Sequence, residues 1–119
     1  MAKVLIVDDS KTSRRILKNY LTQFGHEVVG EAENGEMGVE MYKNLKPDVV
    51  TLDITMPVMD GVEALGKIKE FDKDAKVVMV TAAGQRDHVM GAIKAGALEF
   101  VTKPFEENIL KKVFEKICD

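Results

Sequence analysis

The chain opens with the stretch Val4-Leu5-Ile6-Val7-Asp8-Asp9, an apolar run that ends in two acidic residues. A second run of the same kind, Val49-Val50-Thr51-Leu52, ends in Asp53. Such continuous aliphatic runs are typical of strands buried on both faces of a parallel sheet. Because carboxylates resist burial, we expect the three acids to lie outside the core. If the two strands are parallel neighbours, the acids converge on one small patch that a hard cation would stabilise.

The composition limits the class of protein. The chain has 119 residues, enough for one compact domain but too few for two ordinary ones, so residues 1–119 are expected to form a single domain. A net charge of -3, with both signs spread along the chain, argues against nucleic-acid binding. No apolar stretch is long enough to span a membrane, and no signal-peptide pattern is present. The single cysteine, Cys118, cannot form an internal disulfide, so we expect a cytoplasmic protein.

Short apolar runs alternate with longer amphipathic stretches along the whole chain. The expected strands are Lys3–Val7, Glu27–Ala32, Val49–Leu52, Lys76–Val80 and Leu98–Val101. Apolar residues at helical spacing follow each strand and predict five helices. Their apolar positions fall within residues 16–24, 39–45, 62–71, 89–93 and 109–117. Gly25 and Gly96 are expected to end the first and fourth helices.

Five strand–helix units predict an α/β fold with a doubly wound, five-stranded parallel sheet covered by helices on both faces. The strand order 2-1-3-4-5 of the flavodoxin-like fold is the expected arrangement. It places strands 1 and 3 side by side at the topological switch point, where ligands bind at the carboxyl edge of such sheets. In that arrangement Asp8, Asp9 and Asp53 meet.

Each of these acids has an ordinary structural explanation as well as a functional one. Asp8 and Asp9 could simply favour the start of a helix, and Asp53 could be a loop acid at the end of a strand. A pair facing a third acid favours metal binding, and carboxylates with water suit Mg²⁺. A carboxylate at the floor of a cleft can also attack phosphorus and become an acyl phosphate, which makes Asp53 a candidate nucleophile.

Two further polar residues end later strands. Thr81 follows Val77–Val80, and its hydroxyl could donate to a phosphoryl oxygen, although a lone Thr at a strand end is an ordinary residue. Lys103 precedes Pro104, which favours an extended backbone. An ammonium group pointing along the sheet edge would lower the repulsion among the acids and could hold a phosphoryl oxygen.

Other notable residues of the sequence have structural interpretations. Pro57 and Asp60-Gly61, which follow Asp53, are typical of turns. We interpret Arg14-Arg15 as solvated residues that support solubility, with contact to an acidic partner as the alternative. Most of the methionines are expected to fill gaps in the core and loops.

Taken in order, these motifs resemble the receiver domains of two-component response regulators, and in particular the stand-alone regulators of chemotaxis. The resemblance covers essentially the whole chain. It rests on four motifs: Val7-Asp8-Asp9-Ser10, the stretch from Asp53 to Asp60-Gly61, Thr81-Ala82 and Lys103-Pro104-Phe105. Each motif alone is weak, but the four in this order at strand ends are specific.

The resemblance implies a role for each site residue. Asp53 would accept a phosphoryl group from a phosphohistidine of a sensor histidine kinase. Asp9, Asp53 and the backbone carbonyl of Thr55 would ligate Mg²⁺ directly, and Asp8 would act largely through water. Thr81 and Lys103 would bind the phosphoryl oxygens, and the Lys103–Pro104 bond is expected to be cis.

The resemblance also implies how a signal leaves the site. Phe100 stands where the family has an aromatic residue, often Tyr, that swings inward when Thr81 moves; the alternative for Phe100 is simple core packing. Residues 87–119 would form the output face. Thr55 and Ala83 would flank the path of the hydrolytic water, and Ala83 has no polar group to orient it.

The expected protein is therefore a signalling switch that assists its own phosphorylation and dephosphorylation, without turning over an external metabolite. Its partners would be a chemotaxis-type histidine kinase, a flagellar motor switch protein or another output target, and a phosphatase. No nucleic acid or membrane is expected to bind, and a monomer is expected.

Several alternatives remain open from the sequence. A phosphatase of the haloacid-dehalogenase type also uses an Asp nucleophile and Mg²⁺, but it needs a second acid where Thr55 stands. A flavin carrier would need a phosphate-binding loop where Asp8-Asp9 stand. A receiver domain of another phosphorelay, or one cut from a longer regulator, is the remaining alternative. The end of the chain within the last helix favours a stand-alone protein.

Overall fold

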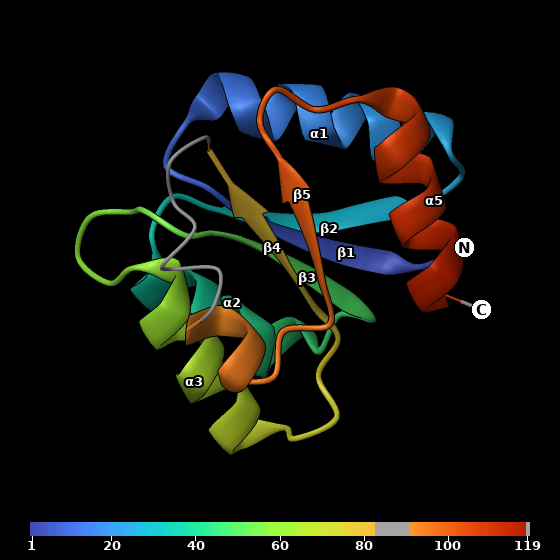
Figure 1. Cartoon of the computed structure of the whole chain (residues 1–119). Helices are drawn as coiled ribbons and strands as arrows, with labels where there is room; N and C mark the ends of the chain where they lie inside the picture. Colours follow the sequence, from blue (N-terminus) through green and yellow to red (C-terminus); the bar gives the residue numbers. More distant parts are fainter. Residues whose placement is uncertain (83–90, 119) are drawn as a thin grey trace.

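A five-stranded parallel sheet, in the order β2-β1-β3-β4-β5, runs through the middle of the molecule (Figure 1). The computed structural model describes residues 1–82 and 91–118. The strands are β1 (Lys3–Val7), β2 (Glu27–Ala32), β3 (Val49–Asp53), β4 (Val77–Thr81) and β5 (Glu99–Thr102). The predicted fold class and strand order are confirmed.

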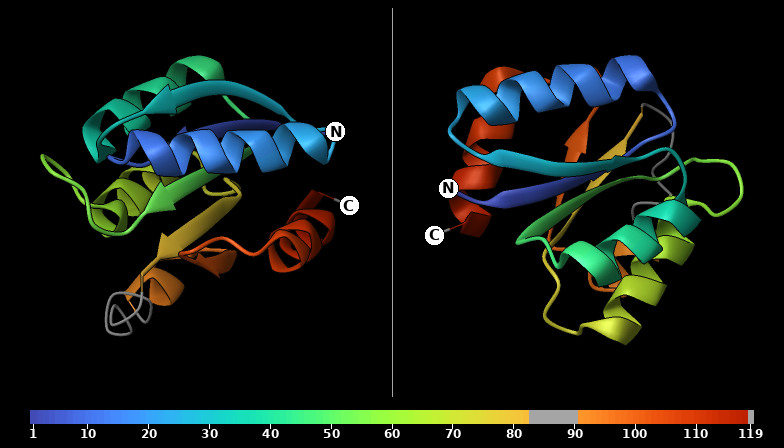
Figure 2. Two further views of the ribbon diagram at one scale, coloured as in Figure 1. Left: turned by 90° about the horizontal axis from the view of Figure 1, so that it is seen from above. Right: turned by 180° about the vertical axis from the view of Figure 1, so that it is seen from behind.

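Helices cover both faces of this sheet. The labelled helices are α1 (Lys11–Gln23), α2 (Gly35–Leu45), α3 (Gly61–Phe71) and α5 (Glu107–Cys118). Figures 1 and 2 show α1 and α5 on one face and α2 and α3 on the other. Residues 91–94 are helical at the position predicted for the fourth helix, whose expected apolar residue Val89 lies outside the described residues. No helix in residues 1–82 or 91–118 is long and apolar enough to cross a membrane.

The core consists of two apolar layers, one on each face of the sheet. Strands β1, β3 and β4 are buried along almost their whole length, and their side chains alternate between the two layers. Leu5 and Leu52 pack toward α2 and α3, whereas Val4 and Ile6 pack toward α1 and α5. Burial on both faces explains why these strands are continuous apolar runs in the sequence.

Three helices begin with the same local device. Ser10, Asn34 and Asp60 each stand just before a helix, and their side chains accept hydrogen bonds from the backbone N–H three residues later, at 3.2, 2.9 and 2.8 Å. Each cap satisfies a donor that has no partner inside the helix and stabilises it by about 1 kcal/mol. All three caps lie at the carboxyl edge of the sheet, where the chain leaves β1, β2 and the loop after β3.

β3 ends one residue later than the sequence predicts, and β4 and β5 are each shifted by one residue toward the C-terminus. Asp53 and Thr81 are the last residues of β3 and β4. The backbone ladder continues there, because the N–H of Ile54 donates to the carbonyl of Val80 at 3.1 Å and that of Lys103 to the carbonyl of Thr81 at 2.9 Å. The ladder thus fixes the backbone beside two candidate site residues.

Candidate functional site

Three carboxylates meet at the carboxyl edge of the sheet, beyond the ends of β1 and β3. β1 and β3 are parallel neighbours, with Val7 opposite Leu52, so the residues that follow them lie side by side. Asp8, Asp9 and Asp53 each offer a carboxylate oxygen, and these oxygens lie within 4.8 Å of one another. The convergence expected from the strand order is therefore present.

The prediction that these acids lie outside the core is wrong for two of them. Asp8 is 3% exposed and Asp53 is 6% exposed, whereas Asp9 is exposed. Burial is possible because the charged oxygens have partners. The N–H of Ser10 donates to Oδ1 of Asp8 at 2.8 Å, and a lysine side chain provides the compensating charge.

Lys103 is that compensating cation. Its Nζ lies 2.9 Å from Oδ2 of Asp8 and 3.4 Å from Oδ2 of Asp53, so one ammonium group bridges two buried acids at the ends of β1 and β3. Burial by itself lowers the pKa of Lys103, but hydrogen bonding to Asp8 and the charge of Asp53 outweigh it and raise the pKa overall. Lys103 therefore stays protonated. Its ammonium group faces the acids at the sheet edge, as predicted.

The surroundings of Asp53 disfavour its charged form. Burial raises its pKa to about 6, and the negative charge of Asp8 adds to the rise, while Lys103 opposes it. The carboxylate is ionised at neutral pH, yet it is more basic than an ordinary aspartate. A basic, partly shielded carboxylate is suited to act as a nucleophile, and a second cation would stabilise its charged form.

The donor set at this edge fits a small divalent cation. It is built from oxygen atoms only, and Mg²⁺ prefers one or two carboxylates together with water. Both oxygens of Asp8 already have partners, whereas Asp9 is exposed and still has a carboxylate oxygen within the cluster. Thr55 lies two residues beyond Asp53 at the same edge and is also exposed.

Thr81 and Phe100 lie on the far side of Asp53 from Asp8. Thr81 ends β4 beside β3, is 6% exposed, and donates its hydroxyl to the carbonyl of Ala82 at 3.1 Å. Phe100 in β5 lies opposite Met79 and packs, half-buried, against the core layer of α2 and α3. The Lys103–Pro104 bond is cis, as predicted. Ala83 lies outside the described residues.

A family model of the response regulator receiver domain matches residues 4–115. The chain belongs to this family. Chemotaxis protein CheY of Thermotoga maritima is 48% identical over 115 residues, which cover 97% of this chain and 96% of that protein. CheY of Listeria monocytogenes is 50% identical over 116 residues, 98% of each chain. The predicted resemblance to receiver domains and to their chemotaxis members is confirmed.

Solved structures agree with the receiver fold. A chain of the CheX–CheY–BeF3–Mg²⁺ complex from Borrelia burgdorferi matches with a TM-score of 0.89 and 41% identity, covering 96% of this chain and 87% of that one. The receiver domain of AraT from Geobacillus stearothermophilus matches with a TM-score of 0.90 and 29% identity, covering 98% and 92%. These matches extend over the entire sheet and its helices.

The structure adds one residue to the receiver site that the sequence interpretation missed. Arg14 is not a solvated surface residue: its side chain is 14% exposed. Its guanidinium donates to the backbone carbonyl of Asp8 at 2.7 Å and to Glu31 at 3.1 Å. Arg14 therefore connects the residue that follows β1 to β2. The adjacent Arg15 is exposed, and the only sequence signal that separates the two is their position on α1.

The prediction that Gly61 belongs to a turn is wrong. Asp60 instead caps α3, and Gly61 is its first residue. A Cβ atom on Gly61 would lie 2.1 Å from the backbone carbonyl oxygen of Asp53, so only glycine lets α3 start this close to β3. The N–H of Gly61 donates to the carbonyl of Ile54 at 2.7 Å. Gly61 thus allows α3 to hold the backbone of the candidate nucleophile.

Proposed function

We propose that this receiver domain is a phosphorylation switch in which Asp53 accepts a phosphoryl group from a phosphohistidine of a sensor histidine kinase. A carboxylate oxygen of Asp53 forms the new bond to phosphorus, while the phosphorus–nitrogen bond breaks and its electron pair returns to the imidazole. The observation that carries this proposal is the placement of a basic, buried Asp53 beside two other acids and Lys103 at the carboxyl edge of the sheet.

Mg²⁺ is the proposed cofactor of this transfer. When bound, it would neutralise the negative charge that collects between the phosphoryl oxygens and the acids. Asp9, Asp53 and the carbonyl of Thr55 are proposed to hold it directly. The two oxygens of Asp8 are engaged by Ser10 and Lys103, which supports a contribution of Asp8 through water.

Thr81 and Lys103 are proposed to receive the phosphoryl oxygens. Lys103 already faces Asp53, and its ammonium group can move from the carboxylate oxygen to a phosphoryl oxygen attached to it. The hydroxyl of Thr81 would leave the carbonyl of Ala82 to donate to another oxygen. We propose that Phe100 then moves inward and alters the output face, a two-state change driven by a local charge.

The proposed output is control of flagellar rotation in chemotaxis. Its support is that several curated relatives at 47–50% identity carry the name chemotaxis protein CheY. The partners would be a chemotaxis-type histidine kinase and a flagellar motor switch protein. The solved CheX–CheY–BeF3–Mg²⁺ complex supports binding of a further protein, for which a phosphatase is proposed. A cytoplasmic, monomeric, single-domain protein over residues 1–119 is part of the same proposal.

The phosphorylation can be tested with a small phosphodonor. The full chain is incubated with a phosphoramidate in Mg²⁺ or in EDTA, and the intact mass is followed over time. We expect one phosphoryl adduct in Mg²⁺, little in EDTA, and none in Asp53→Asn. Asp74→Asn, a change of the same type at an exposed loop far from the site, should be modified like the wild type. An adduct that persists in Asp53→Asn would refute the assignment.

A further inference from the structure

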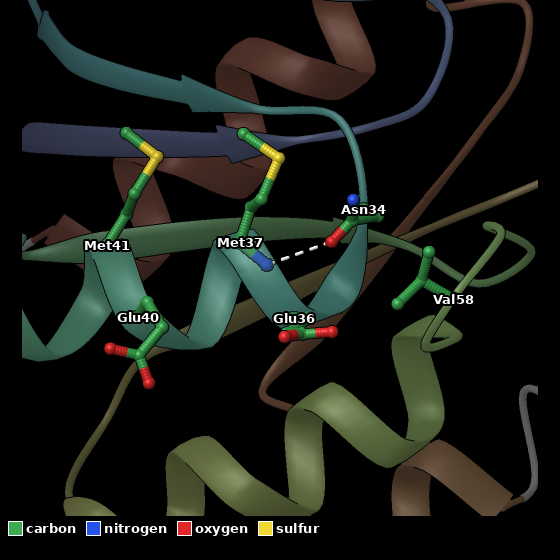
Figure 3. Close-up of a pocket in the computed structure, with 6 residues that line it drawn as sticks. All are labelled: Asn34, Glu36, Met37, Glu40, Met41 and Val58. Atoms are coloured by element: carbon green, nitrogen blue, oxygen red, sulfur yellow. Dashed lines mark hydrogen bonds between the residues drawn. The ribbon is translucent and has the colours of Figure 1, made fainter.

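A groove runs along α2 and the loop between β3 and α3, outside the acidic site (Figure 3). We call it the α2 groove. Its volume is about 360 Å³, at the lower end of the range for ligand pockets and large enough for a bulky side chain with its neighbours. The residues that line it are Asn34, Glu36, Met37, Glu40, Met41 and Val58.

One side of the groove is apolar. Met37 and Met41 are four residues apart and project from the same side of α2, while Val58 faces the N-terminal end of that helix from the loop (Figure 3). Met37 is 41% exposed and Val58 is 74% exposed. Flexible methionines adapt to partners of different shape, so this apolar side suits an inserted side chain.

The other side of the groove is acidic. Glu36 and Glu40 are also four residues apart and point away from the methionines (Figure 3). Within residues 1–82 and 91–118, the ion pairs include neither of these glutamates. Like charges at this spacing repel each other, so a cation from outside the chain would be favoured here.

Val58 has a backbone conformation that its side chain disfavours. Its φ is 68°, and the N–H of Met59 donates to the carbonyl of Pro57 at 2.7 Å, which together describe a tight γ-turn with a left-handed centre. Glycine or asparagine would fit this position with less strain than a β-branched residue. An exposed valine that retains such strain points to a function for its apolar side chain.

We propose that the α2 groove docks a partner protein through a short segment in which a bulky apolar residue is flanked by Lys or Arg. The apolar side chain lies among Met37, Met41 and Val58, and the flanking cations face Glu36 and Glu40. The N–H of Gly35 donates to the carbonyl of Met59 at 3.0 Å, so α2 and the loop form the groove as one joined surface. This docking does not require phosphorylation of Asp53.

A random peptide library displayed on phage tests this proposal when it is selected against the immobilised full chain. We expect enriched peptides to carry a central Leu, Ile, Phe or Met next to basic residues. Binding of a synthetic enriched peptide is then measured by fluorescence anisotropy. Met37→Ser, Val58→Asn and Glu40→Lys should each weaken binding about tenfold, and added salt should weaken it in the wild type.

Two controls separate docking from folding. Ile16→Ser removes an apolar side chain of similar exposure, 42%, from α1 and should leave peptide binding unchanged. Val58→Asn relieves the left-handed strain, so its unfolding temperature should not fall although its binding does. The proposal is overturned if Met37→Ser and Val58→Asn weaken the binding of no enriched peptide. It is also overturned if the enriched peptides lack basic residues. If the wild type is a dimer and Met37→Ser is a monomer, the groove binds a second copy of this chain and the proposal is overturned.

Discussion

Among single residues, Asp53 is the proposed phosphoryl acceptor, and its buried charge lowers the free energy of unfolding. Its pKa is raised to about 6 by burial and by Asp8, so the folded state binds its proton more tightly than the unfolded state does. A carboxyl with a raised pKa costs stability once the pH exceeds its unfolded-state value near 3.8, and the full cost is present above about 6.

Asp53→Asn should therefore stabilise the metal-free protein at pH 7.5, by roughly 1–2 kcal/mol in the free energy of unfolding. Lys103 keeps Asp8 as a partner at 2.9 Å in this variant, which limits the side effects of the change. The gain should shrink as the pH falls from 6 to 4, because wild-type Asp53 then becomes protonated. Urea unfolding in EDTA at several pH values measures it. A gain that is independent of pH would contradict this origin.

Arg14 is expected to matter more than the neighbouring Arg15. Arg14→Gln removes a nearly buried guanidinium that binds the carbonyl of Asp8 and Glu31, and should lower the free energy of unfolding by about 1–3 kcal/mol. It should also weaken Mg²⁺ binding in calorimetry, because the end of β1 is held less firmly. Arg15→Gln, an exposed change of the same type, should alter stability by less than about 0.5 kcal/mol. If Arg14→Gln and Arg15→Gln change stability and Mg²⁺ binding equally, Arg14 does not position Asp8.

At the scale of secondary-structure elements, the start of α3 fixes the position of β3. Gly61→Ala would place a Cβ atom 2.1 Å from the backbone oxygen of Asp53, which only a shift of the helix can relieve. We expect a loss of about 3 kcal/mol or more in the free energy of unfolding and slower phosphorylation. Chemical denaturation and the rate of adduct formation measure the two effects.

Gly66→Ala in the middle of the same helix is the matched control. Nothing lies within 4 Å of a Cβ atom built there, so alanine should stabilise α3 by about 0.5–1 kcal/mol. Phosphorylation should be unchanged. Similar destabilisation by both alanines would mean that helix propensity, and not the contact with Asp53, governs this region.

The elements themselves were largely predictable from the sequence, because apolar periodicity and strand length depend on neighbouring residues. The strand order and the convergence of the acids followed from the topology of the fold. The burial of Asp8 and Asp53 was not predictable in this way, since it depends on Lys103, which is 50 residues from Asp53 in the chain. The partly buried side chain of Arg14 and the close approach at Gly61 likewise depend on tertiary packing, for which the local sequence has no signal.

At the scale of the whole molecule, the acid patch should couple metal binding to global stability. A ligand that binds only the folded state stabilises it by about 1.4 kcal/mol at ten times its dissociation constant. Mg²⁺ should therefore raise the unfolding temperature of the wild type relative to EDTA. The rise should be much smaller in Asp9→Asn and Asp53→Asn, while Asp74→Asn should respond as the wild type does. Scanning calorimetry measures these shifts, and an equal rise in all four proteins would contradict a site at this edge of the sheet.

Reductive trapping identifies the residue that carries the phosphoryl group, which we propose to be Asp53. Borohydride converts an acyl phosphate of aspartate to homoserine, which tandem mass spectrometry assigns to a single position. After incubation with a phosphoramidate and Mg²⁺, we predict homoserine at position 53 and at no other aspartate. Trapped homoserine at Asp8, Asp9 or Asp60, with Asp53 unchanged, would show that Asp53 is not the phosphoryl acceptor.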